Sequence, residues 1–174
     1  ALQNFAEPFV AVLGGAKIDD YLEFMEKVLN STMDARILTT GLLGILLNYS
    51  KGYDFGKKTT DLLKAKGLYE LIPRLKELYD RFGNSKLMVP FNFCVADSTD
   101  PDNIVYEFME ARNIHNHRHK DNFEIIDISG DNVGVTQYGP ILSKAKSILF
   151  KGPAGQYEQF LGDGGTLQIL RMME

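Results

Sequence analysis

The sequence predicts a soluble α/β domain, a doubly wound three-layer sandwich built on a mainly parallel sheet. Short continuous apolar runs such as Phe9–Leu13 are typical of strands that are buried on both faces. Stretches with apolar residues spaced three and four apart, which indicate helices, alternate with these runs. Turns containing glycine follow several of the runs, as is usual where a parallel strand ends and a helix begins.

The composition fits one domain and narrows the classes of partner. A chain of 174 residues can bury a sizeable core, and its 44% hydrophobic and 24% charged residues are ordinary for a globular fold. The net charge of -4 provides no basic field for nucleic acid, and the apolar runs are too short to span a membrane. A single cysteine, Cys94, excludes an internal disulfide and suits the cytoplasm.

The first four elements alternate regularly. Phe9–Leu13 is the first predicted strand. Residues 18–30 place apolar side chains on one helical face, and two aspartates in the first turn suit the helix dipole. Residues 35–39 then predict a second strand, and residues 42–49 predict a second helix.

Prolines divide the middle of the chain. Two helices are predicted within residues 59–82, because Pro73 lacks an N–H group and interrupts a helix. Residues 87–96 predict a strand with Pro90 near its start. Residues 97–122 are polar and rich in turn formers, so we expect a long connection there.

The last third continues the alternation. In order it predicts a strand over residues 123–128, a helix over 135–146, a strand over 147–150, a turn over 152–155 and a helix over 160–173. Such alternation favours a parallel sheet with helices on both faces. Ligands are therefore expected at the carboxyl ends of the strands.

The first candidate site is the loop Gly14-Gly15-Ala16-Lys17, which joins the first strand to the first helix. Glycine lets backbone N–H groups approach an anion closely, and the start of a helix adds positive potential. Lys17 adds a full charge for a phosphate oxygen. These residues fit a phosphate loop, but by themselves they also fit a plain tight turn with a surface lysine.

Two further loops follow predicted strands. Thr39-Thr40-Gly41 could complete a phosphate cradle, or Thr40 could simply cap the next helix. Lys151-Gly152-Pro153-Ala154-Gly155 could lie flat against a nucleoside, with Glu158 accepting hydrogen bonds from a ribose, or it could be an ordinary turn. Three glycine turns at one edge of a sheet favour a ligand site more than any one of them does.

One segment imitates a phosphate loop without meeting its requirements. Gly56-Lys57-Lys58-Thr59 looks like the end of a Walker A motif. The preceding glycine, Gly52, is one residue too close, and the segment follows a predicted helix instead of a strand. We therefore do not expect a phosphate loop there.

Histidine and cysteine chemistry is weakly indicated. His115, His117 and His119 would share one face if their segment were extended, and there they could bind a metal. No carboxylate or cysteine partner is evident in the sequence, so a solvated polar loop is favoured. Cys94 lies in an apolar run and is more typical of a core residue than of a nucleophile.

The order of these motifs resembles the phosphoglycerate kinase family, in its archaeal form, over nearly the whole chain. Residues 8–20 around the first loop and Gly152-Pro153-Ala154-Gly155-Gln156-Tyr157-Glu158 carry the resemblance most specifically. Weaker matches follow the same order: Leu38-Thr39-Thr40-Gly41-Leu42, Gly52-Tyr53-Asp54-Phe55-Gly56, residues 90–96, Asp127-Ile128-Ser129, Phe160 and Gly165-Thr166. The whole chain, residues 1–174, is similar to the C-terminal, nucleotide-binding domain of that family, which has a Rossmann-like fold.

The resemblance implies a reaction and a set of site residues. The family transfers a phosphoryl group between 1,3-bisphosphoglycerate and ADP in glycolysis and gluconeogenesis, with Mg-ATP and Mg-ADP as substrates. It implies that Lys17 is catalytic and contacts the transferring phosphate. It also implies a nucleotide site formed by Gly14, Gly15, Ala16, Lys17, Gly41, Leu42, Gly152, Pro153 and Glu158.

Five positions depart from the family's pattern. Thr40 lies where the second loop is usually richer in glycine, which we expect to narrow the room for a phosphate. Lys151 replaces an asparagine, and Tyr21 replaces a lysine that many members carry, though archaeal forms often lack it. Asn92 replaces an aspartate, and Ser129 replaces a glycine.

The resemblance also predicts a fragment of a longer protein. The family's N-terminal domain, expected to bind 3-phosphoglycerate, and the Gly-Gly-Gly-Asp loop, expected to help hold Mg²⁺, have no counterpart in this sequence. The piece alone is therefore expected to bind a nucleotide without catalysing transfer. A sheet lacking its last strand is expected to self-associate through an uncovered edge. A divergent, non-catalytic homologue and a domain with an unrelated ligand stay open as alternatives.

Overall fold

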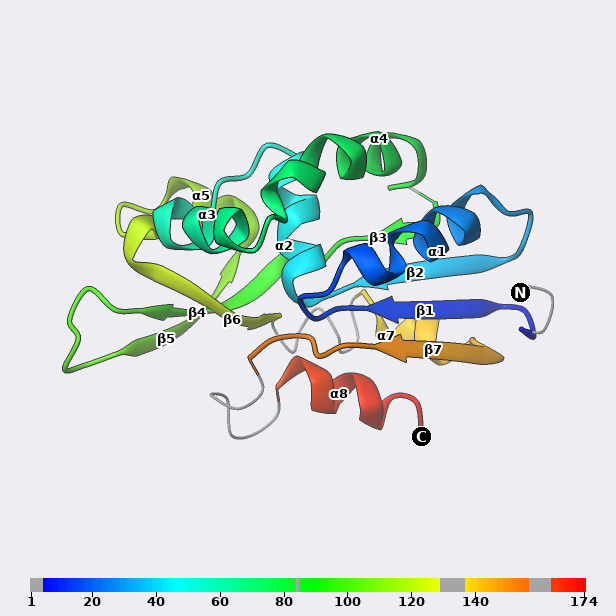
Figure 1. Ribbon diagram of the computed structural model, residues 1–174. Coiled ribbons are helices and arrows are strands. Elements are labelled where there is room, and N and C mark those ends of the chain that lie inside the picture. The colour runs from blue at the N-terminus through cyan, green and yellow to red at the C-terminus, as the bar shows by residue number, and fades with distance from the viewer. Residues whose placement is uncertain (1–4, 84, 129–136, 157–163) are drawn as a thin grey trace.

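The computed structural model describes residues 5–83, 85–128, 137–156 and 164–174 (Figure 1). The strands form two sheets, a four-stranded one in the order β3-β2-β1-β7 and a three-stranded one in the order β5-β4-β6. The strands are β1 (Phe9–Leu13), β2 (Ala35–Thr39), β3 (Leu87–Met88), β4 (Asn92–Asp97), β5 (Val105–Glu110), β6 (Phe123–Ile128) and β7 (Ser147–Lys151).

The described helices lie between the strands along the chain. They are α1 (Asp19–Asn30), α2 (Gly41–Ser50), α3 (Gly56–Ala65), α4 (Ile72–Phe82), α5 (Ala111–Asn116), α7 (Gly139–Leu142) and α8 (Gly165–Arg171), with short 3-10 turns η2 (Tyr69–Leu71) and η3 (Lys120–Asn122). Helix α1 packs on β2, α2 on α4, and α3 on β6. In Figure 1, α2 lies between the region of the four-stranded sheet and that of the three-stranded sheet, and α3 lies beside α5 over the three-stranded sheet.

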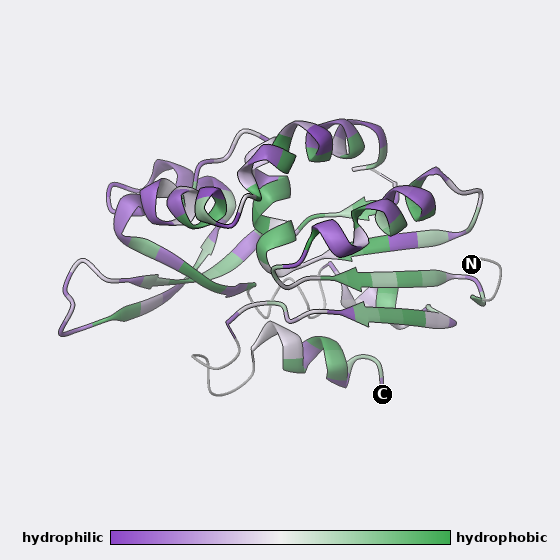
Figure 2. Cartoon of the chain, viewed as in Figure 1, coloured by the Kyte–Doolittle hydropathy of each residue, from purple (hydrophilic) through white to green (hydrophobic). Residues whose placement is uncertain are grey.

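The four-stranded sheet is parallel throughout, as predicted. Strand β1 is central, with Phe9 aligned to Ala35 of β2 on one side and to Ser147 of β7 on the other. All five residues of β1 are buried, because a parallel sheet is covered on both faces. Figure 2 shows these strands as mainly hydrophobic and the visible surfaces of α1 and α4 as mainly hydrophilic.

Helix α1 confirms the predicted amphipathic pattern. Its buried residues are Tyr21, Leu22, Met25, Val28 and Leu29, and they join the main core. On its exposed side the guanidinium of Arg74 in α4 donates two hydrogen bonds to the carboxylate of Glu26, at 2.6 and 2.7 Å. This pair lowers the pKa of the Glu26 carboxyl below its usual value and links α1 to α4.

Strands β4 and β6, which were predicted in the parallel sheet, instead form a separate sheet with β5. The segment predicted as one strand over residues 87–96 is divided into β3 and β4, with Pro90 between them. Proline has no N–H for a ladder, so the chain leaves the parallel sheet there and β4 starts a separate antiparallel sheet. The polar segment 97–122, expected to be a connection, contains β5 and α5, because β5 is largely exposed and lacks an apolar run.

Pro73 begins a helix where an interruption was expected. It lies in the first turn of α4, where a missing N–H costs nothing, so the prediction of two helices in this region is confirmed. Helix α3 begins at Gly56, three residues before the predicted start. Helix α7 is shorter than the predicted 135–146, and residues 135–136 and 160–163 of the last two predicted helices lie outside the described residues.

Within the described residues, none of the helices combines the length and the hydropathy needed to cross a lipid bilayer.

Candidate functional site

The three loops picked out from the sequence meet at one edge of the parallel sheet. Strands β1, β2 and β7 run the same way, so their carboxyl ends lie together. The N–H of Gly14 donates to the carbonyl of Lys151 at 2.8 Å, and the N–H of Gly41 donates to the carbonyl of Ala154 at 2.9 Å. These bonds join the first and second loops directly to the third.

The joining bonds use the very donors that were expected to face a phosphate. Besides Gly14 and Gly41, Gly15 donates its N–H to the carbonyl of Pro153 at 2.9 Å. These three N–H groups therefore hold the loops together and are not available to an anion. The glycines shape the site, but the expectation that their N–H groups cradle a phosphate was wrong.

Donors for an anion remain at the start of α2. The first bond inside this helix runs from the N–H of Gly44 to the carbonyl of Thr40, at 3.0 Å. The N–H groups of Leu42 and Leu43 precede that bond and so have no acceptor within the helix. Together with the helix dipole they favour a negative group beside Leu42.

Close contact between the loops explains two of the glycines. A Cβ on Gly14 would lie 2.2 Å from the hydroxyl oxygen of Thr40 and 2.5 Å from the carbonyl oxygen of Pro153. Gly152 has a φ of +78, and a Cβ there would lie 2.5 Å from the carbonyl oxygen of Gly14. Because nothing larger than hydrogen fits, the two loops can approach within hydrogen-bond distance.

The side chain of Thr40 does not reduce the room for a phosphate, although this was expected from the replacement of a glycine. Its side chain is fully buried and its hydroxyl donates to the carbonyl of Leu13 at 3.4 Å. It therefore fills the space between the loops and is not among the residues that line the neighbouring cavity. Although Thr40 is the residue before α2, its side chain makes no capping hydrogen bond.

Two lysines flank the first loop. Lys17 is exposed just before α1, outside the cavity lining. Tyr21, in the first turn of α1, donates its hydroxyl to the carbonyl of Gly14 at 3.0 Å, and burial raises the pKa of Tyr21 above its usual value. The ammonium of Lys151 lies 5.6 Å from the centre of the Tyr21 ring. Tyr21 thus supports the loop and positions a second cation near it.

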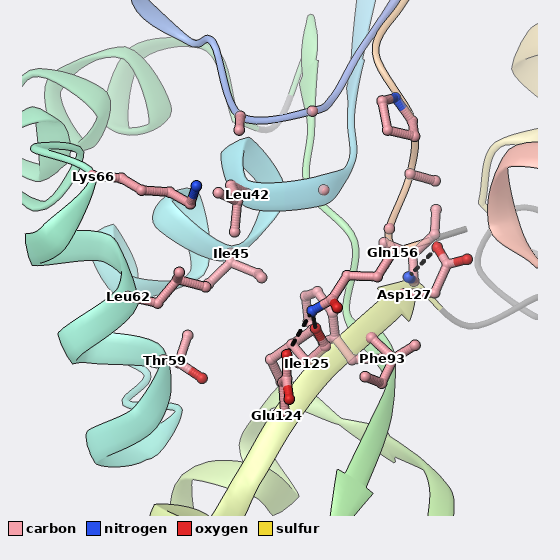
Figure 3. A pocket seen from close by; sticks show the side chains of 18 of the residues that line it. Leu42, Ile45, Thr59, Leu62, Lys66, Phe93, Glu124, Ile125, Asp127 and Gln156 are labelled. Atoms are coloured by element: carbon pink, nitrogen blue, oxygen red, sulfur yellow. Dashed lines mark hydrogen bonds between the residues drawn. The ribbon is translucent and has the colours of Figure 1, made fainter. Parts of the chain in front are cut away.

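A cavity of about 750 Å³ opens beside the loops (Figure 3). Its size suits one small ligand. The loops and the start of α2 form one side, and α3 and β6 form the other. The lining residues are Gly15, Ala16, Gly41, Leu42, Ile45, Lys58, Thr59, Leu62, Lys66, Phe93, Glu124, Ile125, Ile126, Asp127, Ile128, Pro153, Ala154, Gly155 and Gln156.

Asp127, near the end of β6, is a buried carboxylate in the cavity wall. Its side-chain oxygens accept hydrogen bonds from the N–H of Ile128 at 2.7 Å and of Gly165 at 3.0 Å. Burial raises the pKa of the Asp127 carboxyl to about 6, because it disfavours the charged form, and the two N–H donors oppose that shift only in part. The side chain fastens the start of α8 to the antiparallel sheet.

Comparison with known proteins identifies the family. The sequence model of the family described as "Phosphoglycerate kinase" matches residues 1–174. The chain belongs to the phosphoglycerate kinase family. It is 33% identical to the phosphoglycerate kinase of Pyrococcus abyssi over 94% of this chain and 38% of that protein. It is 36% identical to that of Thermoplasma volcanium over 93% of this chain and 37% of that protein.

Solved structures agree on the fold. The crystal structure of phosphoglycerate kinase from Pyrococcus horikoshii OT3 matches with a TM-score of 0.80 and 27% identity, over 97% of this chain and 39% of that one. The structure from Coxiella burnetii, at 21% identity, matches with a TM-score of 0.76 over 99% of this chain and 41% of that one. The chain thus spans about two fifths of the phosphoglycerate kinases that it matches.

The structure brings most of the nine predicted nucleotide-binding residues together. Five of them line the cavity: Gly15, Ala16, Gly41, Leu42 and Pro153. Gly14 and Gly152 form the loop contacts behind it, and Lys17 is exposed beside it. Glu158, and with it the predicted ribose contact, lies outside the described residues, as does Ser129.

The residues on the far side of the cavity were missed. Lys58 and Thr59 belong to the segment that imitates a Walker A motif, and they line the cavity from α3 instead of forming a phosphate loop. Glu124 and Ile125 lie in β6 and Gln156 follows the third loop. Because α3 and β6 meet this edge only through tertiary packing, no local pattern pointed to them.

The histidines do not form a metal site in the described part of the chain. His115 is in α5, while His117 and His119 follow it, so the three imidazoles are not aligned along an extended strand. The Nδ1 atom of His115 accepts a hydrogen bond from the N–H of Asp54, and that of His117 accepts one from the N–H of His119. The described residues include no cluster of three or more metal-ligating side chains.

Cys94 is a core residue, as expected. It is 1% exposed within β4, and burial raises the pKa of its thiol to about 11. A thiol with such a pKa is almost entirely protonated at neutral pH and is a poor nucleophile.

Proposed function

We propose that this chain is the nucleotide-binding half of a phosphoglycerate kinase that transfers a phosphoryl group between 1,3-bisphosphoglycerate and ADP. The observation that carries the proposal is the cavity of about 750 Å³ between the three loops and α3, in a chain of this family. The cavity has an anion-favouring side and an apolar side, as a nucleotide requires. We treat residues 1–174 as one such domain.

The phosphates would lie beside the start of α2 and the first loop. The N–H groups of Leu42 and Leu43 are the donors there, and Lys17 is exposed one residue beyond Ala16. Because phosphoryl transfer depends mainly on positioning and on neutralising charge, the ammonium of Lys17 would stabilise the transferring phosphate. Lys151 supplies a second cation near the same loop.

The nucleoside would occupy the apolar part of the cavity. Leu42 and Ile45 of α2 and Leu62 of α3 line this part, and Figure 3 shows the side chains of Ile45 and Leu62 pointing toward one another. Phe93 and Ile125 complete the walls from the antiparallel sheet. An apolar lining suits a flat purine, because burial of its faces removes apolar surface from water.

Transfer itself would need parts of a longer protein. The chain covers 38% of the length of the Pyrococcus abyssi relative, and the 3-phosphoglycerate site is expected on an N-terminal domain. In the reaction the bond between phosphorus and the acyl oxygen breaks while a bond to a β-phosphate oxygen of ADP forms. Both substrates must be in line for this, with water excluded.

Magnesium would enter as part of the nucleotide substrate. Mg²⁺ is usually held by one or two carboxylates together with phosphates and water. The carboxylate of Asp127 already accepts two backbone N–H groups, and no larger cluster of ligating side chains occurs among the described residues. These residues therefore do not fit a complete Mg²⁺ site, and we assign no step to one.

Calorimetric titration with ADP tests the proposal. We expect weak binding, with a dissociation constant of about 1 mM, because the chain covers only 38% of the length of the Pyrococcus abyssi relative. Lys17→Ala should weaken it about tenfold, since a hydrogen bond to a charged group is lost. Lys27→Ala is the control, because Lys27 is exposed in the last turn of α1. Absence of binding at millimolar ADP contradicts the proposal.

A divergent, non-catalytic homologue is the second candidate. It is motivated by the departures at Thr40, Lys151 and Asn92. The buried position of Thr40 weakens this motive, because its side chain stays out of the cavity. An activity assay on the parent protein separates the two candidates, since turnover of 3-phosphoglycerate and ATP excludes the second.

Self-association and a cytoplasmic location stay predictions. Within the described residues β7 pairs with β1 alone, so its other edge is open to a strand from a second copy. Light scattering would test this expectation. The single buried cysteine is consistent with a reducing compartment.

A further inference from the structure

A second cavity, of about 620 Å³, lies at the end of the parallel sheet opposite to the three loops. Arg36 lines it from the start of β2, and Lys86 lines it from the residue before β3. The ends of α1 and α4 complete it, on the right-hand side of Figure 1. Three of its lining residues, Arg36, Arg81 and Lys86, are cations, and none of the described residues that line it is acidic.

Two of the cations are held close together by neutral partners. The Nη2 atom of Arg81 donates to Oδ1 of Asn30 at 2.8 Å, and Nζ of Lys86 donates to the carbonyl oxygen of Ser31 at 2.6 Å. Because Asn30 and Ser31 are consecutive in the chain, the guanidinium and the ammonium lie near each other. The guanidinium of Arg81 also lies 4.8 Å from the centre of the Phe82 ring, which helps to fix its orientation.

Arg36 keeps part of its guanidinium for a ligand. Within the described part of the chain only its Nη1 atom donates, to Oδ1 of Asp34 at 3.3 Å and to the carbonyl oxygen of Ala35 at 3.1 Å. A guanidinium has five N–H groups and an ammonium has three, so each of the three cations retains donors. Asp34 balances the charge of Arg36, and Arg81 and Lys86 make no ion pair with a described carboxylate. The cavity is therefore positively charged in a chain whose net charge is -4.

Capping of the helix ends does not account for these cations. Lysine and arginine often bond the last carbonyl groups of a helix. At the end of α1, however, the carbonyl oxygen of Val28 accepts the N–H of Ser31 at 3.2 Å and its hydroxyl at 2.7 Å. At the end of α4, the carbonyl oxygen of Phe82 accepts the N–H groups of Ser85 and Lys86, both at 3.0 Å. Of the three cations only Lys86 bonds a carbonyl at a helix end, with one of its three hydrogens.

We propose that this cavity is a binding site for a phosphate group, either free phosphate or the phosphate of a small metabolite. The planar fork of an arginine matches two phosphate oxygens, and a lysine adds a point charge. The volume leaves room for a small molecule that carries the phosphate. The inference does not depend on the proposed function, because it uses other residues at the other end of the sheet.

Nuclear magnetic resonance spectra of the backbone amides, recorded while inorganic phosphate is added at constant ionic strength, test the proposal. The N–H signals of Ser31, Ser85 and Lys86 should shift with a dissociation constant of about 1 mM. Arg81→Gln should weaken this binding about tenfold, because charge-assisted bonds are lost. Arg112→Gln is the matched control, since the side chain of Arg112 is 70% exposed on α5 and outside the cavity lining. It should leave the dissociation constant unchanged.

Glycerol 3-phosphate separates the two sources of the phosphate group. If it shifts the same signals at lower concentration than inorganic phosphate does, the ligand is a phosphorylated metabolite, and otherwise it is free phosphate.

Three results overturn the proposal. The signals do not move at about 10 mM phosphate, chloride at the same ionic strength moves them equally, or Arg81→Gln leaves the affinity unchanged. Shifts confined to the N–H signals of Leu42 and Leu43 also overturn it, and they support the phosphate end of the nucleotide site instead. Far-ultraviolet circular dichroism checks that both variants are folded.

Discussion

The parallel and antiparallel sheets supply opposite sides of one cavity by different means. At the ends of β1, β2 and β7 the backbone shapes the site, through glycines that let three loops bond to one another. On β6 side chains do this work, with Glu124 and Asp127 in the cavity wall. The parallel half therefore shapes the cavity with its backbone, and the antiparallel half lines it with side chains.

The strands of the parallel sheet are also more deeply buried than the edge strand of the antiparallel sheet. All of β1 is buried, whereas the first four residues of β5 are exposed. A strand with both faces covered contributes to the core along its whole length, and an exposed edge strand contributes little. Stability should therefore reside mainly in the parallel sheet.

The largest expected effect compares truncations to alanine in the two sheets. Ile37 of β2 is fully buried, so Ile37→Ala should lower the free energy of unfolding by about 3 kcal/mol through lost burial and a cavity. Val105 of β5 is 44% exposed, and Val105→Ala should cost less than about 1 kcal/mol. Urea denaturation measures both. Similar losses for the two variants would break the comparison.

A smaller effect tests the loop contacts at the end of the parallel sheet. Gly152→Ala places a Cβ 2.5 Å from the carbonyl oxygen of Gly14 and should cost about 2 kcal/mol more than Gly52→Ala. Gly52 also has a positive φ, but nothing lies within 4 Å of its added Cβ, so it controls for backbone strain. If Gly152→Ala and Gly52→Ala lower the free energy of unfolding by similar amounts, the loops can move apart easily and the prediction is wrong.

An effect of about the same size as that of Gly152→Ala concerns pH and the antiparallel sheet. The pKa of Asp127 is raised from 3.8 to about 6, so between pH 4 and 6 the folded chain binds more protons than the unfolded chain. The titration of Asp127 therefore lowers the free energy of unfolding by about 2 kcal/mol as pH rises through that window. Glu26 and Asp54, whose pKa values are lowered, act in the opposite direction at lower pH.

Asp127→Asn separates these contributions. The variant keeps the other carboxylates, so the difference between its unfolding free energy and that of the unaltered chain isolates Asp127. Relative to the unaltered chain, the variant should gain about 2 kcal/mol from pH 4 to pH 7. A difference that does not change with pH would mean that the Asp127 carboxylate is not destabilised by burial.

Prediction from the sequence succeeded where local pattern and tertiary structure agree. Apolar runs marked β1 and β2, and the spacing in residues 18–30 marked α1. It failed for β5, which is a strand because β4 pairs with it and not because of its own apolar content. It also failed for the donors of Gly14, Gly15 and Gly41, since their acceptors lie in other loops.

The sequence by itself determined the parallel sheet, the loops at its carboxyl edge and the family. A continuous apolar run reflects the burial of a strand on both faces, and a glycine turn reflects a positive φ. Each is a local requirement that a short segment must meet on its own. Only the tertiary structure decided that α3 packs on β6, so that Thr59 and Glu124 both line the cavity. Those contacts join segments 65 residues apart in the chain, and packing between distant segments leaves no periodic pattern in either one.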